Sequence, residues 1–303
     1  MTIQSKLEAA LPYLPQTVQQ AVKRLPDPMQ IQELRLRIGR PVQIVRQTGR
    51  TVLLLPNGQP VTADRQMIDT VFHNICAHSV HSWQDAIRQG FITIAGGSRV
   101  GLCGTAVMQQ GILETVRAVS GMNIRIASER IGCADALFSR LGNRIAAGGL
   151  LIAGAPNSGK TTLLRDLARI LGESHRICLL DARGELAAVQ GGVPQFEIGA
   201  QTDVFDGYPK SAGMEIAVRV MSPEIIITDE LGNSDETEML LQSLHTGVQF
   251  IASAHAGSLS EITARPQLRR LIEAGAFRTG ILLGSGAQTG QITEIRRLEG
   301  DAA

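Results

Sequence analysis

The sequence is poor in aromatic residues, which make up 3% of its 303 positions. Proteins that bind single-stranded nucleic acid stack the bases on exposed aromatic rings, so this scarcity argues against such a surface. The formal net charge is only +1. A chain this close to neutral lacks the overall positive field that attracts nucleic acid. The composition therefore predicts a protein with no nucleic-acid partner.

Cysteine and long apolar runs are also scarce. Cys76, Cys103, Cys133 and Cys178 are far apart and form no C-x-x-C pair, which is typical of reduced thiols in a cytoplasmic protein. The first residues contain no apolar core of the kind found in a secretory signal peptide. No run approaches the roughly 18 uncharged apolar residues that a membrane span needs. We expect a cytoplasmic protein that reaches a membrane only through a partner.

The first part of the chain changes its pattern several times within short distances. Its elements are expected at residues 1–30 (helix interrupted by prolines), 34–55 (an antiparallel meander), 64–88 (helix), 91–108 (hairpin) and 115–127 (strand). The sequence therefore predicts a small α+β domain over residues 1–128.

From residue 129 onward, strands alternate regularly with helices. An amphipathic helix at 129–147 comes first, and it is followed by apolar strands near 150–154, 177–181, 224–228 and 248–254, with helices at 159–171, 209–221 and 234–245 between them. Such alternation indicates parallel strands joined by crossover helices. We therefore expect an α/β domain with a parallel sheet over residues 129–303, closing with two further strand patterns.

A glycine-rich stretch, GAPNSGKTT, lies between the first of these strands and the next helix and matches G-x-x-x-x-G-K-[ST], the Walker A or P-loop pattern. Backbone N–H groups of such a loop and the positive end of the following helix bind a polyphosphate. Lys160 would reach the β- and γ-phosphates, and the Thr161 hydroxyl would complete a Mg²⁺ shell. The predicted nucleotide-binding residues are Gly154, Ala155, Pro156, Asn157, Ser158, Gly159, Lys160, Thr161 and Thr162.

Two later strands of the second domain end in acidic residues. One is followed by Asp229 and Glu230, and another by Asp181, with Glu185 four residues beyond it. Carboxyl ends of parallel strands form the sheet edge at which ligands bind in this architecture. We expect Asp229 to hold Mg²⁺ through water and Glu230 to orient or deprotonate the attacking water. The sequence leaves Glu185 and Glu230 both open as the general base.

A histidine and several arginines add to this site. His255 ends the strand near 248–254, and it is interpreted either as a sensor of the γ-phosphate or as a cap of the next helix. Phosphoryl transfer needs extra positive charge, which ring ATPases take from a neighbouring subunit. Arg117 and Arg125 are the main candidates for that contribution and Arg99 is a weaker one, whereas Arg219 is a candidate within its own subunit.

Beyond these residues, the chain resembles the stage III sporulation AA family, a branch of the type II/IV secretion (traffic) ATPase superfamily of P-loop NTPases. The resemblance covers both domains and rests on the stretches GFITIAGGSRVGLCGTAV, RAVSGMNIRIA, GAPNSGKTTLLRDLAR, DARGE, TDVFDGYPKSAGMEIAVRVMSPEIIITDELG and SAHAG. It implies a RecA-like second domain and a hexameric ring that binds ATP and Mg²⁺ between its domains.

The same resemblance implies roles for individual residues. Asp181 and Glu185 fall in the acidic "Asp box", with catalytic or Mg²⁺–water roles, and His255 falls in the "His box" as γ-phosphate sensor. Arg117 and Arg125 lie near the arginines that face a neighbour's phosphates. The implied function is an ATP-hydrolysing motor of a channel between mother cell and forespore. Such a motor would lie in the mother-cell cytoplasm and dock on integral membrane proteins of that channel.

Two alternatives remain. A P-loop small-molecule kinase would need an arginine-rich lid, and the only late arginine cluster is Arg265, Arg269 and Arg270, followed by a strand pattern. A RecA-like ATPase that depends on nucleic acid is the other, although the low net charge and the few aromatic residues weigh against it.

Overall fold

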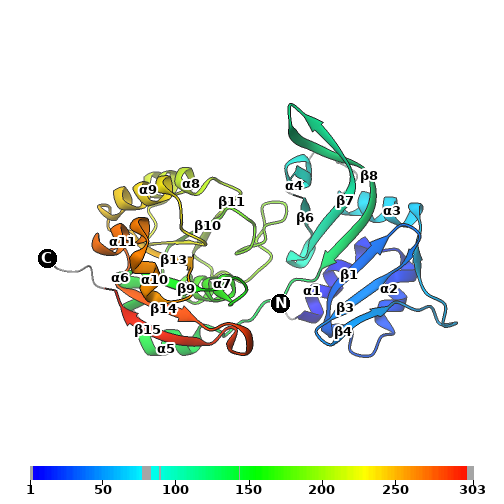
Figure 1. Cartoon of the computed structure of the whole chain (residues 1–303), viewed down its shortest axis with the longest axis horizontal. Helices are drawn as coiled ribbons and strands as arrows, with labels where there is room; N and C mark the ends of the chain where they lie inside the picture. Colours follow the sequence, from blue (N-terminus) through cyan, green and yellow to red (C-terminus); the bar gives the residue numbers. More distant parts are fainter. Residues whose placement is uncertain (1–2, 77–82, 89, 143, 299–303) are drawn as a thin grey trace. The chain divides into compact units, whose positions relative to one another are not determined.

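The computed structural model describes residues 3–76, 83–88, 90–142 and 144–298, and the chain divides into two compact units (Figure 1). Unit 1 contains Met1–Glu129 together with Ala188–Phe196, and unit 2 contains Arg130–Ala187 and Glu197–Ala303. The sequence predicts one boundary, between residues 128 and 129. The sequence pattern does not predict that residues 188–196 return to unit 1.

Unit 1 is built on a six-stranded antiparallel sheet with helices packed on it. Its helices are α1 (Ile3–Ala10), α2 (Gln16–Lys23), α3 (Arg65–Ile75) and α4 (Gln84–Arg88). Its strands are β1 (Ile31–Arg37), β2 (Arg40–Pro41), β3 (Gln43–Arg46), β4 (Gly49–Val52), β5 (Thr62–Ala63), β6 (Phe91–Thr93), β7 (Arg99–Gln109) and β8 (Ile112–Arg125). The main sheet has the order β4-β3-β1-β8-β7-β6, and β2 pairs separately with β5.

The alternation of apolar residues in β1 explains why this sheet forms. Leu34 pairs with Ile44 on β3 and with Ile124 on β8, and all three side chains are fully buried. Residues on one strand point alternately to the two faces, so this row belongs to the face that the helices cover. Cross-strand burial of this kind stabilises the register, because a shift by one residue would expose the whole row.

Helix α3 begins where the sequence predicts it and is shorter than predicted. The side chain of Asp64 accepts a hydrogen bond from the backbone N–H of Met67 at 2.7 Å, which satisfies one of the unpaired groups of the first turn. The helix ends at Ile75, and residues 77–82 of the predicted 64–88 helix lie outside the described residues. Helix α4 covers the last part of that range.

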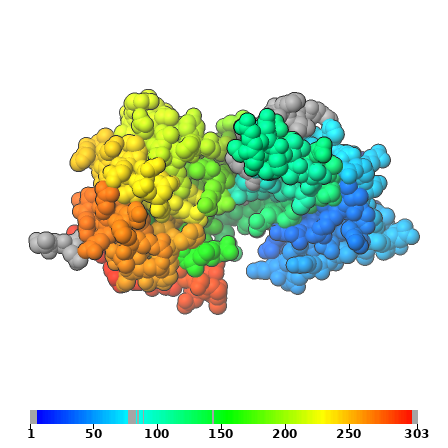
Figure 2. Space-filling model, turned by 45° about the horizontal axis from the view of Figure 1, so that its top comes forward, coloured from blue at the N-terminus to red at the C-terminus, as the bar shows by residue number. Residues whose placement is uncertain are grey.

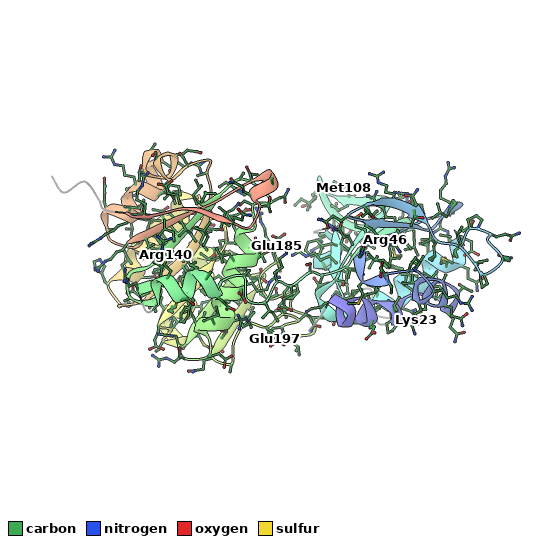
Figure 3. The ribbon with its side chains drawn as sticks, turned by 90° about the horizontal axis from the view of Figure 1, so that it is seen from below. Lys23, Arg46, Met108, Arg140, Glu185 and Glu197 are labelled. Atoms are coloured by element: carbon green, nitrogen blue, oxygen red, sulfur yellow. The ribbon has the colours of Figure 1, made fainter. Side chains whose placement is uncertain are left out.

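Strands β7 and β8 form a long hairpin that turns at Gln110 and Gly111. Midway along β7 the strands approach each other so tightly that a Cβ on Gly104 would lie 2.7 Å from the side chain of Val116. Met108, labelled in Figure 3, and Ile112 lie beside the turn, and both are largely exposed. The hairpin therefore carries its apolar tip into solvent rather than into the core of unit 1.

Unit 2 is built on a seven-stranded sheet with helices on both faces. Its helices are α5 (Asp135–Leu141), α6 (Arg144–Gly148), α7 (Lys160–Leu171), α8 (Lys210–Ile216, continued by a π-helical turn at Ala217–Met221), α9 (Ser234–Leu244), α10 (Leu259–Ala264) and α11 (Pro266–Glu273). Its strands are β9 (Leu150–Gly154), β10 (Ile177–Asp181), β11 (Thr202–Asp206), β12 (Ile225–Thr228), β13 (Gln249–His255), β14 (Thr279–Leu283) and β15 (Ile292–Arg297).

The sheet has the order β11-β10-β12-β13-β9-β14-β15, and every neighbouring pair is parallel except β14 and β15. Strands β9, β10 and β12 are buried along their whole length, as expected for strands covered on both faces. This confirms the predicted α/β class with a parallel sheet. It also brings the carboxyl ends of β9, β10, β12 and β13 to one edge.

The structure of unit 2 differs from the prediction in three places. The expected helix at 129–147 is divided into α5 and α6 at Gly142, which has a positive φ of 51°. Strand β11 was not expected, because it lies at the edge of the sheet and Phe205 is the one residue of the strand that is buried. Helices α10 and α11 follow β13, and α11 lies beside α9 on the surface (Figures 1 and 2).

No helix among the described residues of either unit is long and apolar enough to cross a membrane.

Candidate nucleotide-binding and catalytic site

The loop between β9 and α7 has the backbone geometry of a phosphate-binding loop. Gly154 is required at its start, because a Cβ there would lie 2.3 Å from the Oγ atom of Ser158. Asn157 and Gly159 both have positive φ angles, of 62° and 101°, which turn the chain back toward helix α7. Ser158 Oγ is buried and has no hydrogen-bond partner among the described residues. A loop that turns around an unsatisfied polar atom fits the oxygen atoms of a phosphate.

Lys160 is the first residue of α7, and its side chain curls back over the loop. It is 5% exposed, and its Nζ atom donates to the carbonyl oxygens of Gly154 at 2.9 Å and Ala155 at 2.8 Å. Nζ also lies 3.1 Å from Nδ1 of His255. Burial lowers the pKa of Lys160, and the nearby carboxylate of Glu230 acts in the opposite direction. The ammonium group thus lies at the point where the loop, the helix and β13 meet.

His255 stands directly beside the loop because β13 pairs with β9. In this register the Cα of His255 is the partner of the Cα of Gly154. An ammonium group has no lone pair, so Nδ1 of the ring must accept the bond from Lys160. Nε2 therefore carries the proton, and it donates to Oε1 of Glu230 at 2.7 Å. The histidine joins the loop lysine to the acidic residue after β12.

Glu230 is held from both sides by charged or polar groups. Its Oε2 atom lies 2.7 Å from Nη1 of Arg183, while Oε1 accepts the bond from His255. Burial acts to raise the pKa of Glu230, but the bond from His255 and the charge of Arg183 outweigh it and lower the pKa. Lys160, His255, Glu230 and Arg183 therefore form one continuous series of contacts, which we call the site network.

The backbone of Glu230 is also unusual. Its φ of 40° places a non-glycine residue in the left-handed region, a conformation that costs about 1–3 kcal/mol and persists only where surrounding groups fix it. One such group is Ser253 on β13, whose Oγ accepts the Glu230 N–H at 3.0 Å. Strained backbone of this kind is found preferentially at functional sites.

Asp229 is almost completely buried beside Glu230. It is 2% exposed, and its Oδ1 lies 3.2 Å from Nζ of Lys210 without making a hydrogen bond among the described residues. Burial raises the pKa of Asp229, and Lys210 opposes this effect. Thr161 is half-buried in the first turn of α7. A carboxylate and a hydroxyl group are oxygen ligands of the kind that Mg²⁺ prefers, so these two residues fit the ion by their chemistry.

Asp181 has a different environment from Asp229. Its two oxygens accept hydrogen bonds from the backbone N–H groups of Glu185 at 2.7 Å, Leu186 at 3.0 Å and Ala187 at 2.8 Å. The guanidinium of Arg165 on α7 binds the carbonyl oxygens of Glu185 and Leu186 in the same turn. Asp181 therefore fixes the path of the loop after β10. Its predicted catalytic role, and that of Glu185 at the margin of unit 2 (Figure 3), remain predictions.

Among the candidate arginines, Arg219 belongs to unit 2. Arg219 follows α8 three residues before Ser222, whose carbonyl oxygen accepts a bond from Arg176 just before β10. This is the amino-terminal edge of the sheet, opposite the site network, and the catalytic role expected of Arg219 stays a prediction. There it pairs with Glu215 at 3.4 Å.

The other candidate arginines belong to unit 1. Arg99 stacks over the ring of Phe91 at 4.5 Å, and Arg125 lies 3.4 Å from Glu33. Arg117 and Arg125 are both exposed on β8, and their proposed contribution to a neighbouring subunit stays a prediction.

The late arginine cluster is engaged in surface ion pairs. Arg265 pairs with Glu261 and Arg269 pairs with Glu273, each one helical turn away. Arg270 pairs with Glu238 at 2.7 Å and so links α11 to α9. These pairs hold the arginines on helices and offer no support for a kinase lid.

Sequence reasoning missed two site residues, Arg183 and Lys210. Arg183 lies inside the DARGE stretch, and Lys210 directly follows a proline at the start of a helix in a chain that has few lysines. Those were the available signals. Neither indicates which oxygens the cation meets, because this depends on how the loops after β10 and β11 return to the end of β12.

The chain matches a known protein family over almost its whole length. A family model described as "Sporulation stage III, protein AA" matches residues 6–302. The stage III sporulation protein AA of Bacillus subtilis (strain 168) is 36% identical over 296 residues, which cover 95% of this chain and 94% of that protein. Protein SEEDLING PLASTID DEVELOPMENT 1 of Arabidopsis thaliana is 35% identical over 129 residues, which cover 41% of this chain and 19% of that protein.

Solved structures of ATPases share the fold. The ATPase DotB of Legionella pneumophila matches with a TM-score of 0.56 and 14% identity, covering 93% of this chain and 76% of that one. The pilus retraction motor PilT, solved with bound ADP, matches with a TM-score of 0.57 and 14% identity, covering 83% of this chain and 74% of that one. This likeness confirms the RecA-like α/β fold. Since the family model and the Bacillus subtilis relative both cover almost the whole chain, the chain belongs to the sporulation stage III protein AA family.

Proposed function

We propose that the protein is an ATP-hydrolysing motor. The observation that carries the proposal is the site network, in which the lysine of the phosphate-binding loop, a histidine and a carboxylate contact one another at the edge of a RecA-like sheet. A polyphosphate bound by the loop would meet Lys160, and His255 joins Lys160 to Glu230 in the network. A carboxylate in this position would orient water near the terminal phosphate.

The chemistry follows from the arrangement of these residues. The backbone N–H groups of residues 157–161 and the ammonium of Lys160 would bind the phosphates, while Thr161 and Asp229 would hold Mg²⁺. Bound Mg²⁺ supplies charge neutralisation at the phosphates. Glu230 would orient the attacking water. We favour Glu230 over Glu185 as the base because its carboxylate contacts His255 at 2.7 Å, whereas Asp181 and Arg165 bind the Glu185 backbone.

His255 would report the state of the phosphate. Its Nδ1 accepts from Lys160 and its Nε2–H donates to Glu230, so a phosphate that draws the ammonium away changes the bonding of the ring and of the carboxylate together. A two-state change of this kind is how γ-phosphate sensors act in nucleotide-driven switches.

The proposed assembly is a hexameric ring in the cytoplasm of the mother cell. Arg117 and Arg125 would supply positive charge to the nucleotide of a neighbouring subunit, in keeping with their exposure on β8. Motion of the ring would act on integral membrane proteins of a channel between mother cell and forespore. Membership of the sporulation family and the shared fold with DotB and PilT support this part of the proposal.

The test compares the wild-type protein with Lys160→Ala and with Lys23→Ala, a control on an exposed lysine of α2 (Figure 3). Phosphate release from ATP and molecular mass are measured with and without nucleotide. We expect Lys160→Ala to lower turnover on the order of 10²–10³-fold, because it removes a charge from the developing transition state. Lys23→Ala should leave turnover unchanged.

Retained turnover in Lys160→Ala would contradict the assignment of the loop. A wild-type protein that stays monomeric with ATP would contradict the ring, and transfer of phosphate to a small molecule would favour a kinase.

A further inference from the structure

A second buried lysine lies at the edge of the sheet, outside the phosphate-binding loop. Lys210 begins helix α8, directly after Pro209, and its side chain is 9% exposed. Its Nζ atom donates to the carbonyl oxygens of Asp229 and, at 3.0 Å, of Glu230. The same atom lies 3.2 Å from Oδ1 of Asp229. Three oxygens of two consecutive residues therefore surround one ammonium group.

A compact ammonium suits this position better than a guanidinium. Lysine offers three donors that radiate from one atom, whereas arginine offers a planar fork made for two parallel bonds. The chain uses arginine at most of its basic positions and has lysine only at Lys6, Lys23, Lys160 and Lys210. Burying an unpaired ammonium is costly, so a lysine in this place indicates that its three contacts are favourable together.

These contacts fix the one strained residue of the site network. Glu230 has a φ of 40°, and groups from two different elements hold its backbone there. Ser253 Oγ accepts its N–H at 3.0 Å, and Lys210 binds its carbonyl oxygen and the one before it. With the peptide groups on both sides of the residue bound, Glu230 cannot relax to the ordinary right-handed conformation without losing them.

The direction of the Glu230 side chain depends on this backbone. In the observed conformation its carboxylate meets His255 at 2.7 Å and Arg183 at 2.7 Å. If Glu230 changed from the left-handed to the right-handed conformation, its Cα–Cβ bond would point in another direction. The carboxylate would then lose both contacts. Lys210 thus acts on the position of a carboxylate that its ammonium group does not itself contact.

We propose that Lys210 is a positioning residue for hydrolysis, which holds the turn at residues 229–230 so that the Glu230 carboxylate stays in the site network. This inference rests on the proposed ATPase function. It adds Lys210 of α8 to the site. None of the residues predicted from the loop pattern comes from that helix. Its role is distinct from that of Lys160, which would contact the nucleotide.

The test compares Lys210→Met, which keeps the apolar stem and removes the donors, with Lys210→Arg, which keeps the charge and changes the donor geometry. Ser253→Ala removes the other contact to the same backbone, and Lys23→Met is the matched surface control. For each variant, kcat, KM, the affinity for a fluorescent ATP analogue and the melting temperature are measured. Amide hydrogen exchange of a peptide covering residues 229–231 is followed without nucleotide.

We expect Lys210→Met to lower kcat about 10- to 100-fold, a part of what a general base contributes, with nucleotide affinity changed less than about twofold. Exchange at residues 229–231 should become faster, because the turn loses its bonds. Ser253→Ala should act in the same direction and Lys210→Arg should be intermediate. The double variant Lys210→Met with Glu230→Gln should hydrolyse ATP less than about twofold more slowly than Glu230→Gln alone, because both substitutions act through one carboxylate.

Three results would overturn the inference: unchanged kcat in Lys210→Met, full additivity with Glu230→Gln, or a loss of nucleotide affinity that accounts for the whole effect. If Lys210→Met does not fold, unchanged kcat and exchange in Ser253→Ala and Lys210→Arg would overturn it equally. These outcomes differ from failure of the ATPase proposal, in which the wild-type protein itself shows no turnover that Lys160→Ala abolishes.

Discussion

Replacing Lys6 with methionine should strongly destabilise unit 1. Lys6 is completely buried, and its Nζ lies 3.3 Å from Oε2 of Glu129, whose side chain is 4% exposed. The ammonium also donates to the carbonyl oxygen of Gln195 at 2.5 Å and lies 4.5 Å from the centre of the Phe196 ring. Methionine keeps the length and the apolar stem of the side chain but removes the ammonium group from beside the buried Glu129 carboxylate.

The magnitude follows from the burial of both partners. Removing one member of a buried ion pair typically costs about 3–5 kcal/mol, because the remaining charge is left in a medium that solvates it poorly. At a urea dependence of about 2 kcal/mol/M, a loss of about 4 kcal/mol lowers the unfolding midpoint by about 2 M. The double variant Lys6→Met with Glu129→Gln removes the carboxylate charge as well, so we expect it to recover at least about half of the loss.

Tryptophan fluorescence offers a selective assay. Trp83 is the one tryptophan of the sequence and packs against the core of unit 1, so its emission follows the unfolding of that unit alone. Urea titrations of the wild type, the two single variants and the double variant complete a double-mutant cycle. A midpoint for Lys6→Met within about 0.3 M of the wild type, or a double variant no more stable than Lys6→Met, would refute the reasoning.

Two further predictions concern unit 2 and the thiols. Burial acts to raise the pKa of Asp166, but hydrogen bonds from Arg169 and from the N–H groups of Ala134 and Gly132 outweigh it and hold the pKa below its ordinary 3.8. Its stabilising effect is therefore present above pH 3.8 and lost as the pH falls through the lower native value. Thermal unfolding between pH 7 and pH 3 should show Asp166→Asn less stable by about 1.5–3 kcal/mol at pH 7, with the difference shrinking toward pH 3; a constant difference would contradict this. Burial raises the pKa of Cys76 to about 11 and that of Cys178 to about 12, and burial with the Asp166 carboxylate raises that of Cys133 to about 12. At pH 8 the exposed Cys103 should therefore react fastest with a thiol reagent, and Cys103→Ser should remove the fast phase.

The parts of the site that follow directly from strand–loop–helix alternation were predictable. Buried strands that alternate with helices form a parallel sheet, and residues just past the ends of those strands then share one edge. From the sequence alone, that reasoning predicts that Lys160, Glu230 and His255 lie near one another. The pairing of His255 with Gly154 and the contacts of the site network agree with that expectation.

The other parts depend on long-range contacts that leave no periodic pattern. Lys210 and Arg183 reach Glu230 from loops whose paths are set by hydrogen bonds such as those of Asp181, and these bonds join residues in a non-repeating order. Strand β11 has one buried residue and lies at a sheet edge, so the alternation of apolar residues is too weak to reveal it. The place of Arg219 at the amino-terminal edge of the sheet was not predictable either, because a position on a helix before an acidic strand does not tell which end of the sheet the residue will reach.

The path of residues 188–196 has a consequence for the order in which the protein is made. This segment is encoded after β9, α7 and β10, yet it belongs to unit 1, where Gln195 accepts a bond from the Gly96 N–H and Gln190 donates to the hydroxyl group of Tyr13. During synthesis, Lys6 emerges from the ribosome long before Gln195 and Phe196 exist to receive its ammonium group. Unit 1 therefore cannot complete its core contacts until much of unit 2 has been translated. A truncated chain ending at residue 129 would carry a buried lysine with part of its environment missing, so expression of an isolated N-terminal unit would need residues 188–196 supplied through a designed linker.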